Sequence, residues 1–514
     1  MINTFFWGSL LRLGESLFQA APTILVGFLV AAVIRRFLGY ELTNRVFGGS
    51  SRRGLLQAWI IGMLLPVCSL GAIPVIRELR RAGLPGGTIL AFALAGPLFN
   101  PLSLLYGLTL SQPQAILGFA LCSLIVVTFV GAAWDRMFPG TASPEPAPGA
   151  VPYGYKRLLS LFIYVSREIV GVSARDVLAG LSGIVLLALI LPPGGLQNAM
   201  GQDNPLAPLL MTLVAMPAYA TPMLAMSQLG MMFQHGNSIG AAFALLSFGA
   251  GMNLGTVTWM RRNYGTRPSL VWMGLLAMVV VLLAYGIERP LRAYESAAAD
   301  HTHAFDIYCR PFEFGISDPM GAAWSRLRQN RGVHELYAMF ALVGFVVSGV
   351  LLRAIDPKNR IEAWLETAAP ATDSLRRGID FVVPNAVVGG AIVLGIVGAS
   401  VVGCFAYYPP PGEVFEEMRI ARAEAMAAAL AGDRQHAEQW IDILDDWTRK
   451  LQVGVYLRHG HLSEYHRMKA HVLREKLEQL EHEVAEGDEA AIKKLIYEIG
   501  QCYQRMHFAY FEDL

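Results

Sequence analysis

Residues 64–100 constrain the fold most strongly. This stretch, LLPVCSLGAIPVIRELRRAGLPGGTILAFALAGPLFN, places prolines, glycines and a cysteine inside sequence apolar enough for a membrane. Spanning helices avoid such breaks, because lipid offers no partner to a backbone N–H or C=O that leaves the helix. Interrupted helices are tolerated inside protein or beside a cavity, and at the bilayer midplane they are typical of transporter sites. The stretch therefore indicates more than an anchor.

The composition also favours a membrane protein. Of 514 residues, 54% are hydrophobic and 16% are charged, and the formal net charge is +1. So small an excess of charge argues against a polyanionic partner such as nucleic acid. The five cysteines lie far apart without CxxC or CxxCH spacing, so neither a disulfide framework nor an Fe–S or zinc site is predicted, and no cofactor is expected. Residues 1–18 form an amphipathic lead-in to a span and lack the pattern of a cleaved signal.

Apolar segments recur along the chain, and most are long enough to cross a bilayer as helices. They lie at 17–34, 54–76, 86–110, 113–133, 177–192, 205–232, 238–260, 268–287, 335–352 and 384–407. Two of them break early, because the limb 54–65 ends before Pro66 and the limb 205–216 ends before Pro217. Limbs of about a dozen residues suit re-entrant elements better than spans.

The basic residues select a topology, because cytoplasmic loops are enriched in Lys and Arg. If 54–81 and 205–232 are hairpins that enter and leave on one side, the basic loops, including Arg77 to Arg81, fall together. The short loops on the other side then contain no Lys or Arg. This predicts a multi-pass protein of the cytoplasmic (inner) membrane, surrounded by the lipid bilayer, with its N-terminus outside.

The same topology exposes an internal repeat. Residues 1–133 and 176–287 both contain span, hairpin, span and span, and the second copy is inverted relative to the first. GLPGGTILAFAL from Gly83 resembles GNSIGAAFALLSF from Gly236, and Pro74 corresponds to Pro222. A cytoplasmic linker, 134–175, joins the copies and includes the Pro/Ala/Gly-rich stretch 139–154. We therefore predict an all-α polytopic membrane protein with an inverted repeat, as in alternating-access transport.

Three further parts follow the repeat: a loop at 288–333, two additional transmembrane helices at 334–408, and a soluble α-helical domain at 412–514. Helical periodicity in the last part appears near 415–431, 434–457, 462–485 and 488–510. Gly432-Asp433 and Gly487-Asp488 predict turns, with the aspartate as N-cap of the next helix. This helical-hairpin tail is predicted to lie outside the cytoplasm and to dock a partner protein.

The motif P-x-C-S-x-G-x-x-P is formed by Pro66, Cys68, Ser69, Gly71 and Pro74, and G-x-x-x-G and LAFALAGP follow it. It resembles the bacterial predicted-permease family that includes the organoarsenical efflux permeases. The resemblance covers about 17–287 and implies a permease whose solute could be an organometalloid. Family members commonly carry CSCG, whereas Leu70 stands here at the second cysteine position. A site made of two thiolates therefore cannot be carried over.

The hairpin tips are the candidate substrate site. Pro74 and Pro222 suit a first helical turn, so the half-helices that follow would present unpaired N–H groups and positive dipole ends. Gly71 is expected to permit the break, since glycine tolerates conformations closed to other residues. The candidate substrate-binding residues are Cys68, Ser69, Gly71, Pro74, Asn100, Tyr219, Thr221, Pro222 and Asn253.

Plainer interpretations stay open for several of these residues. Cys68 with Met216, Met223 and Met226 would suit a thiophilic metalloid, but methionine is commonly core filler and Cys68 is also explained as a small packed residue. Asn100 and Asn253 are equally explained as hydrogen-bonding groups between helices. Residues His301, His303, Asp306 and Cys309 could bind zinc or copper, although a loop without metal is favoured because no spacing signature is matched.

What the sequence lacks narrows the function. The apolar cores of the first eight segments contain no Asp, Glu, Lys, Arg or His, so the charged relays of proton-driven pumps are not expected. No Walker loop is present, and Cys68 has no intramembrane His or carboxylate to activate it, so an enzyme is not expected. The leading hypothesis is a permease for a small solute. The alternative is a channel-like or regulatory membrane component whose tail docks a partner.

Overall fold

The computed structural model is helical wherever it describes regular structure, apart from one isolated β-bridge between Gly201 and Asn237. It describes residues 2–49, 53–140, 156–192, 194–196, 198–291, 303–312, 316, 318–329, 332–366 and 384–512. The chain divides into two compact units, the first comprising residues 1–104 and 114–400 and the second residues 105–113 and 401–514. Each unit is described by itself below.

The first half of the larger unit contains two interruptions between apolar helices. Its elements are α1 (Ile2–Val33), the π-helical η1 (Ile34–Leu38), α2 (Gly39–Val46), α3 (Arg53–Leu64), α4 (Ser69–Arg81), α5 (Gly86–Ala95), the first residues of α6 (Pro101–Leu110), which ends in the second unit, and α7 (Pro113–Met137). We call α3 and α4 the first interrupted pair. The limb before Pro66 ends where the sequence predicts, whereas Arg77 to Arg81, predicted as a loop, are the last residues of α4.

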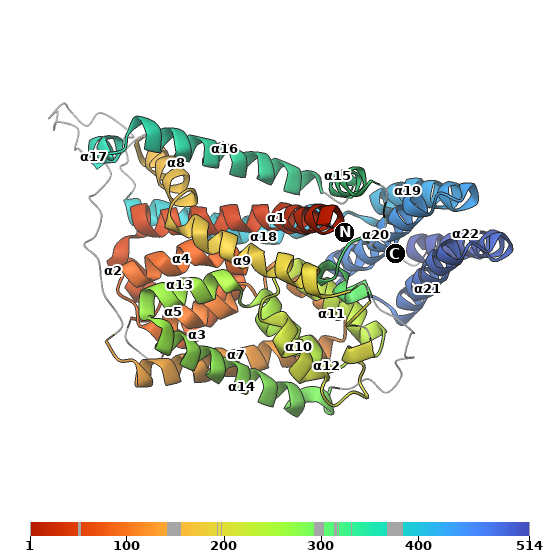
Figure 1. The fold of residues 1–514 in the computed structure, drawn as a ribbon, viewed down its shortest axis with the longest axis horizontal. Coiled ribbons are helices and arrows are strands. Elements are labelled where there is room, and N and C mark those ends of the chain that lie inside the picture. The colour runs from red at the N-terminus through yellow and green to blue at the C-terminus, as the bar shows by residue number, and fades with distance from the viewer. Residues whose placement is uncertain are drawn as a thin grey trace. The chain divides into compact units, whose positions relative to one another are not determined.

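The second half repeats this order. Its elements are α8 (Lys156–Ile169), α9 (Val172–Ile190), η2 (Asn198–Met200), α10 (Ala207–Ala215), α11 (Pro222–Gln234), α12 (Ile239–Leu245), the π-helical η3 (Leu246–Ala250), α13 (Leu254–Tyr264) and α14 (Thr266–Glu288). We call α10 and α11 the second interrupted pair. The helices 239–250 and 254–264 are bent by 58° at the break between them. Figure 1 shows α1, α9, α14 and α16 (Val333–Ile355) lying along roughly one axis, with α1 and α16 running opposite to α9 and α14.

Each interrupted pair begins and ends at the same end of the unit. Asn44, before α3, donates to the carbonyl of Ala82 at the end of α4 at 2.7 Å, and the start of α3 at Gly54 lies against the carbonyl of Phe47. In the second pair, the segment before α10 bonds to the segment after α11, with Gln202 N donating to Gly236 O at 3.1 Å. This is the geometry expected of a hairpin, while the inversion between the halves stays a prediction.

The remaining helices of the larger unit are η4 (His303–Tyr308), α15 (Pro319–Gln329), α16 (Val333–Ile355), α17 (Arg360–Glu366) and α18 (Asn385–Tyr407), the last of which ends in the second unit. The predicted loop 288–333 thus contains helical segments, and the predicted linker 134–175 contains α8. The Pro/Ala/Gly-rich stretch of that linker lies almost wholly outside the described residues.

Six helices among the described residues are long and apolar enough to cross a membrane, or seven if the bent pair counts as one span. Both α16 and α18 leave most of their apolar surface exposed. Lipid can cover such a surface at no cost, whereas water cannot. The chain is therefore a multi-pass membrane protein.

The second unit contains the predicted tail helices, α19 (Pro411–Ala431), α20 (Arg434–His459), α21 (Glu464–Glu486) and α22 (Glu489–Glu512). They enclose one apolar core that includes Met418, Leu444, Leu473 and Met506. Both predicted turns are present. Gly432 and Gly487 take positive φ values of 71° and 84°, and the Asp433 carboxylate accepts from His436 N at 3.2 Å at the start of α20.

Candidate functional site

The four interruptions of the helices meet inside the larger unit, and we call residues 65–68, 96–100, 216–221 and 251–253 the junction. A methyl group placed on Gly96 would lie 3.2 Å from Val67 Cγ2, and one on Gly251 would lie 3.0 Å from Leu98 Cδ2. The N–H of Ala220 donates to the carbonyl of Gly249, at the end of η3, at 2.8 Å. Segments far apart in the sequence are thereby brought together.

Two glycines of α9 allow this helix to pass directly against the junction. A Cβ on Gly180 would collide with Leu70 and would lie 2.9 Å from Asn253 Oδ1. A Cβ on Gly183 would collide with the carbonyl oxygen of Pro217. The first and second interrupted pairs thus approach the same turn of α9.

Helices begin at each interruption, and side chains cap them. Cys68 Sγ accepts from Gly71 N at 3.4 Å at the start of α4, and Thr221 Oγ1 accepts from Leu224 N at 3.2 Å at the start of α11. Asn100 Oδ1 accepts from Ser103 N at 2.7 Å, and Asn253 Oδ1 accepts from Thr256 N at 2.9 Å. Helix N-termini carry partial positive charge, so their convergence favours a solute with electron-rich atoms.

Three polar groups within the junction or directly beside it are buried without a hydrogen-bond partner among the described residues: Ser69 Oγ, the Tyr219 hydroxyl and Asn253 Nδ2. The residues that carry them are 0%, 1% and 0% exposed. The Tyr219 hydroxyl lies near the buried thiol of Cys68 but does not have the geometry of a hydrogen bond to it. Buried polar groups normally find a partner, so these three form a set of unused donors and acceptors.

The structure corrects two predicted roles. Pro74 is not in a first helical turn, because α4 begins at Ser69 and Pro74 lies inside it. It has no N–H to offer the carbonyl of Leu70. Gly71 is helical and does not have positive φ. Its Cα lies directly against the backbone of Thr23 on α1, where the Cβ of any other residue would collide. Its role is therefore close helix packing and not the break. Pro222 does occupy the first turn of α11, as predicted.

Asn100 and Asn253 cap helices through their oxygens, which the sequence did not indicate, and Asn253 keeps its amide nitrogen unused. Of the methionines, Met226 is buried on α11, while Met216 at the end of α10 and Met223 on α11 are half-buried.

The sequence interpretation missed a buried carboxylate, Glu78, near the C-terminal end of α4. Its side chain is 0% exposed. It accepts a hydrogen bond from the Tyr164 hydroxyl of α8 at 2.7 Å, forms an ion pair with Arg35 of η1 at 3.4 Å and forms another with Arg81. Because Arg35 and Tyr164 are distant from Glu78 in the chain, the sequence does not show that they meet it. Charged residues at helical spacing from 77 to 81 are the one sequence signal that could have indicated it.

No group of three or more metal-capable side chains occurs in the described part of the chain. His301 lies outside the described residues. The carbonyl oxygens of Asp306 and Cys309 accept from the guanidinium of Arg12, with Arg12 Nε 3.2 Å from Cys309 O. This arginine holds the segment after η4 against α1.

A family comparison covers the part of the chain that contains the interrupted helices. A family described as predicted permeases matches residues 7–288. The UPF0718 protein YcgR of Bacillus subtilis is 33% identical over 88 residues, which cover 17% of this chain and 30% of that protein. A Streptococcus mutans protein, provisionally named as a subunit of a two-component membrane permease complex, is 23% identical over 86 residues, 17% of this chain and 29% of that protein. The chain thus covers less than a third of either relative. No solved structure matches it.

Proposed function

The chain belongs to the predicted permease family, and on that premise we propose that it moves a small solute across the cytoplasmic membrane by alternating access at the junction. The observation that carries the proposal is the set of unpartnered groups on Ser69, Tyr219 and Asn253, enclosed where several helix N-termini meet. A solute with hydrogen-bonding and electron-rich atoms would supply the missing partners.

The inverted repeat supplies the mechanism in this proposal. Asn100 and Asn253 are separated by the same number of positions as Gly87 and Gly240, so both pairs occupy equivalent places in the two halves. Within each half the asparagine caps a helix through a residue three positions later. Two halves with equivalent contacts can exchange conformations, so that the junction opens first to one side of the membrane and then to the other.

The solute in this proposal is neutral or anionic, because no acidic residue lies among the junction residues 65–68, 96–100, 216–221 and 251–253. Cys68 adds one soft ligand, so an organometalloid is compatible with the site. With Leu70 in place of a second cysteine, coordination through two thiolates is not part of the proposal.

Transport into sealed vesicles tests the proposal. The full-length protein is reconstituted in liposomes, and uptake of radiolabelled candidate solutes is compared between the wild type and Tyr219→Phe. Loss of the unpartnered hydroxyl should reduce transport about tenfold, the effect of one lost hydrogen bond to a solute. Tyr285→Phe is the matched control, because Tyr285 is exposed and bonds to Pro205 O at 2.7 Å, away from the junction. Equal transport by all three proteins would reject the junction as the site.

A second candidate function is supported by the tail and by a relative's name. The Streptococcus mutans relative is named as a subunit of a complex, and Tyr497 and Phe508 of α22 are 69% and 60% exposed. We propose that the tail docks a partner protein. A photoreactive residue at position 497 of the full chain should crosslink one defined protein in native membranes. A photoreactive residue at position 424 serves as the control, because Glu424 is half exposed on another helix of the tail, α19, and should give no crosslink.

A further inference from the structure

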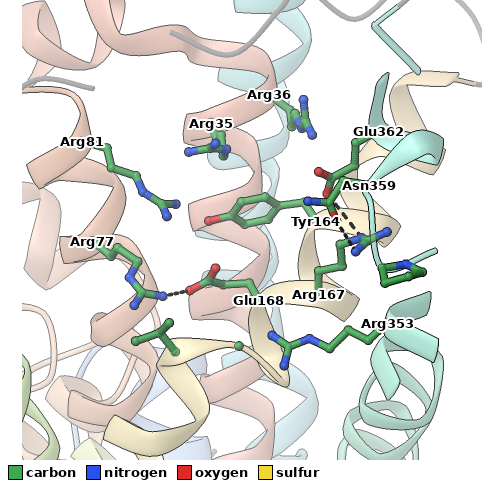
Figure 2. A pocket seen from close by; sticks show the side chains of 13 residues that line it. Arg35, Arg36, Arg77, Arg81, Tyr164, Arg167, Glu168, Arg353, Asn359 and Glu362 are labelled. Atoms are coloured by element: carbon green, nitrogen blue, oxygen red, sulfur yellow. Dashed lines mark hydrogen bonds and ion pairs between the residues drawn. The ribbon is translucent and has the colours of Figure 1, made fainter. Parts of the chain in front are cut away.

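A cavity of about 560 Å³ lies at the opposite end of α4 from the junction. Six arginines line it: Arg35, Arg36, Arg77, Arg81, Arg167 and Arg353. They come from η1, α4, α8 and α16, so four separate parts of the larger unit contribute positive charge to one space. Figure 2 shows their guanidinium groups arranged around Tyr164 and Glu168. We call this space the arginine cavity.

Carboxylates do not neutralise the arginine cavity completely. Glu168 and Glu362 line it, and Glu78, Asp356 and Glu366 contact its arginines from outside the lining. The pairs are Arg35 and Arg81 with Glu78, Arg36 with Glu366, Arg77 with Glu168, and Arg167 with Asp356 and Glu362. Among the described residues, five carboxylates thus form ion pairs with five of the six arginines. Arg353 has no ion-pair or hydrogen-bond partner within the described part of the chain.

Donors also remain unused on arginines that are already paired. Arg36 is 8% exposed and bonds to Glu366 through one terminal nitrogen at 2.8 Å, but its Nε is buried and has no partner among the described residues. Each guanidinium offers five N–H donors, so single ion pairs use few of them. A buried donor without an acceptor costs free energy that a ligand oxygen would recover.

We propose that the arginine cavity binds a phosphate group. Several guanidinium groups around one space match the terminal oxygens of a phosphate, each able to donate two parallel hydrogen bonds. The volume lies within the range of small-molecule sites and leaves room for more than a bare phosphate. The group could belong to a soluble phosphate compound or to the headgroup of an anionic lipid, and the recognition chemistry is the same for both.

Arg353 allows a test that does not disturb an existing ion pair. The full-length protein is placed in nanodiscs of phosphatidylcholine, and inorganic pyrophosphate is titrated while binding and the thermal unfolding midpoint are recorded. The wild type should bind and become more stable, and Arg353→Gln should bind about tenfold more weakly. Arg36→Gln should weaken binding as well. Arg267→Gln is the matched control, since Arg267 is exposed at the start of α14 and does not line the cavity.

A second arm distinguishes the source of the phosphate. Nanodiscs of phosphatidylcholine with and without phosphatidic acid are compared, and retained lipid is counted by native mass spectrometry for the wild type, Arg353→Gln and Arg267→Gln. Retention of phosphatidic acid by the wild type and Arg267→Gln but not by Arg353→Gln supports a lipid headgroup, and pyrophosphate binding with the same pattern supports a soluble ligand. The absence of binding in both arms, or equal binding by the wild type and Arg353→Gln, overturns the proposal. If Arg267→Gln weakens binding as much as Arg353→Gln does, the proposal is also overturned, because the ligand is then attracted to positive charge on the surface in general.

Discussion

Asp135 on α7 accepts a hydrogen bond from the N–H of Gly87 at 2.7 Å, across 48 positions of sequence. Glu288 on α14 accepts one from Gly240 at 2.6 Å, across the same 48 positions. Both carboxylates stand at the N-terminal end of a short apolar helix, α5 or α12, where the helix dipole favours negative charge. Each half of the core therefore uses the same contact to fix its short helix to its last long helix.

The two glycines of this contact should tolerate no side chain. A Cβ on Gly87 would collide with Gly131 O, and one on Gly240 would lie 2.6 Å from Ala284 O. Because the obstacle is backbone, Gly87→Ala and Gly240→Ala should each destabilise the protein by about 1–3 kcal/mol. Gly274→Ala on α14 meets nothing within 4 Å and should leave the unfolding temperature of the purified protein unchanged or slightly raised. If either of the first two variants behaves like Gly274→Ala, the close packing is not needed.

Removal of the Glu78 charge should be more harmful than removal of its hydrogen-bond donor. Glu78→Gln would leave Arg35 and Arg81 without their carboxylate and should cost about 3 kcal/mol or more. Tyr164→Phe removes one hydrogen bond at 2.7 Å and should cost about 1–2 kcal/mol. Thermal unfolding of both purified variants measures the order. A larger loss for Tyr164→Phe would show that the hydrogen bond from α8 matters more than the ion pairs.

The hairpin topology predicts that Arg53 and Arg81 are accessible from the same side of the membrane. The contacts of Asn44 with Ala82 and of Phe47 with Gly54 bring the start of α3 and the end of α4 to one end of the unit. Single cysteines at positions 53 and 81 should therefore react with a membrane-impermeant maleimide in the same preparation, either intact cells or inside-out vesicles. Reaction in opposite preparations would reject the hairpin, and with it the inverted repeat.

Hydropathy and caps sufficed to predict most of the helices. The spans now seen as α7, α14, α16 and α18 follow from apolar length alone, and the turns at Gly432 and Gly487 follow from glycine at a position that needs positive φ. Such signals are local. The caps at Cys68 and Thr221 are local too. The sequence indicated that the helices break near these residues, but it did not indicate the hydrogen bonds by which their side chains cap the next helices.

Contacts between distant segments could not be predicted in this way. Arg77 to Arg81 resemble a loop because they are charged, but inside the fold Glu78 forms ion pairs with two arginines and Glu168 pairs with Arg77. The helix can then continue to its last turn. The start of α4 was misplaced for a related reason, because the cap at Cys68 and the packing of Gly71 on Thr23 fix it, and Pro74 is accommodated in its interior.

The tail should lose stability in acid through Asp445. Burial alone would raise the pKa of its carboxyl, but Arg449 and Arg474, each with a nitrogen 2.6 Å from a carboxylate oxygen, lower it below its usual value. A lowered pKa in the folded state means that the stabilisation is present above the ordinary aspartate pKa and is lost as the pH falls through the folded value. The protection of the α20 and α21 amides against hydrogen exchange, measured relative to the intrinsic rate at each pH, should therefore decrease in acid.

Asp445→Asn should remove that acid dependence and cost about 1–3 kcal/mol at neutral pH. Asp446→Asn is the control. The Asp446 side chain is 53% exposed and pairs with Lys450 at 2.7 Å, and exposed ion pairs contribute about 1 kcal/mol or less. Unchanged acid dependence in Asp445→Asn would assign the acid sensitivity to other groups.

The final prediction separates Cys68 as a soft ligand from Cys68 as a helix cap. Its sulfur accepts from Gly71 N at 3.4 Å and faces the Tyr219 hydroxyl. Serine keeps the size and is a stronger N-cap, whereas alanine removes the cap at a cost of about 1 kcal/mol. Cys68→Ser should therefore fold at least as well as Cys68→Ala.

If the sulfur coordinates the solute, Cys68→Ser should lose transport of trivalent organoarsenicals although it folds, because a hard oxygen replaces a soft ligand. If Cys68 serves only as a helix cap, Cys68→Ser should transport like the wild type, and Cys68→Ala should lose a little stability. Resistance of a sensitised host to trivalent organoarsenicals measures transport, and thermal unfolding measures the fold. Undiminished resistance with Cys68→Ser would exclude thiolate coordination, and the unpartnered groups of Ser69, Tyr219 and Asn253 would then be the recognition elements at the junction.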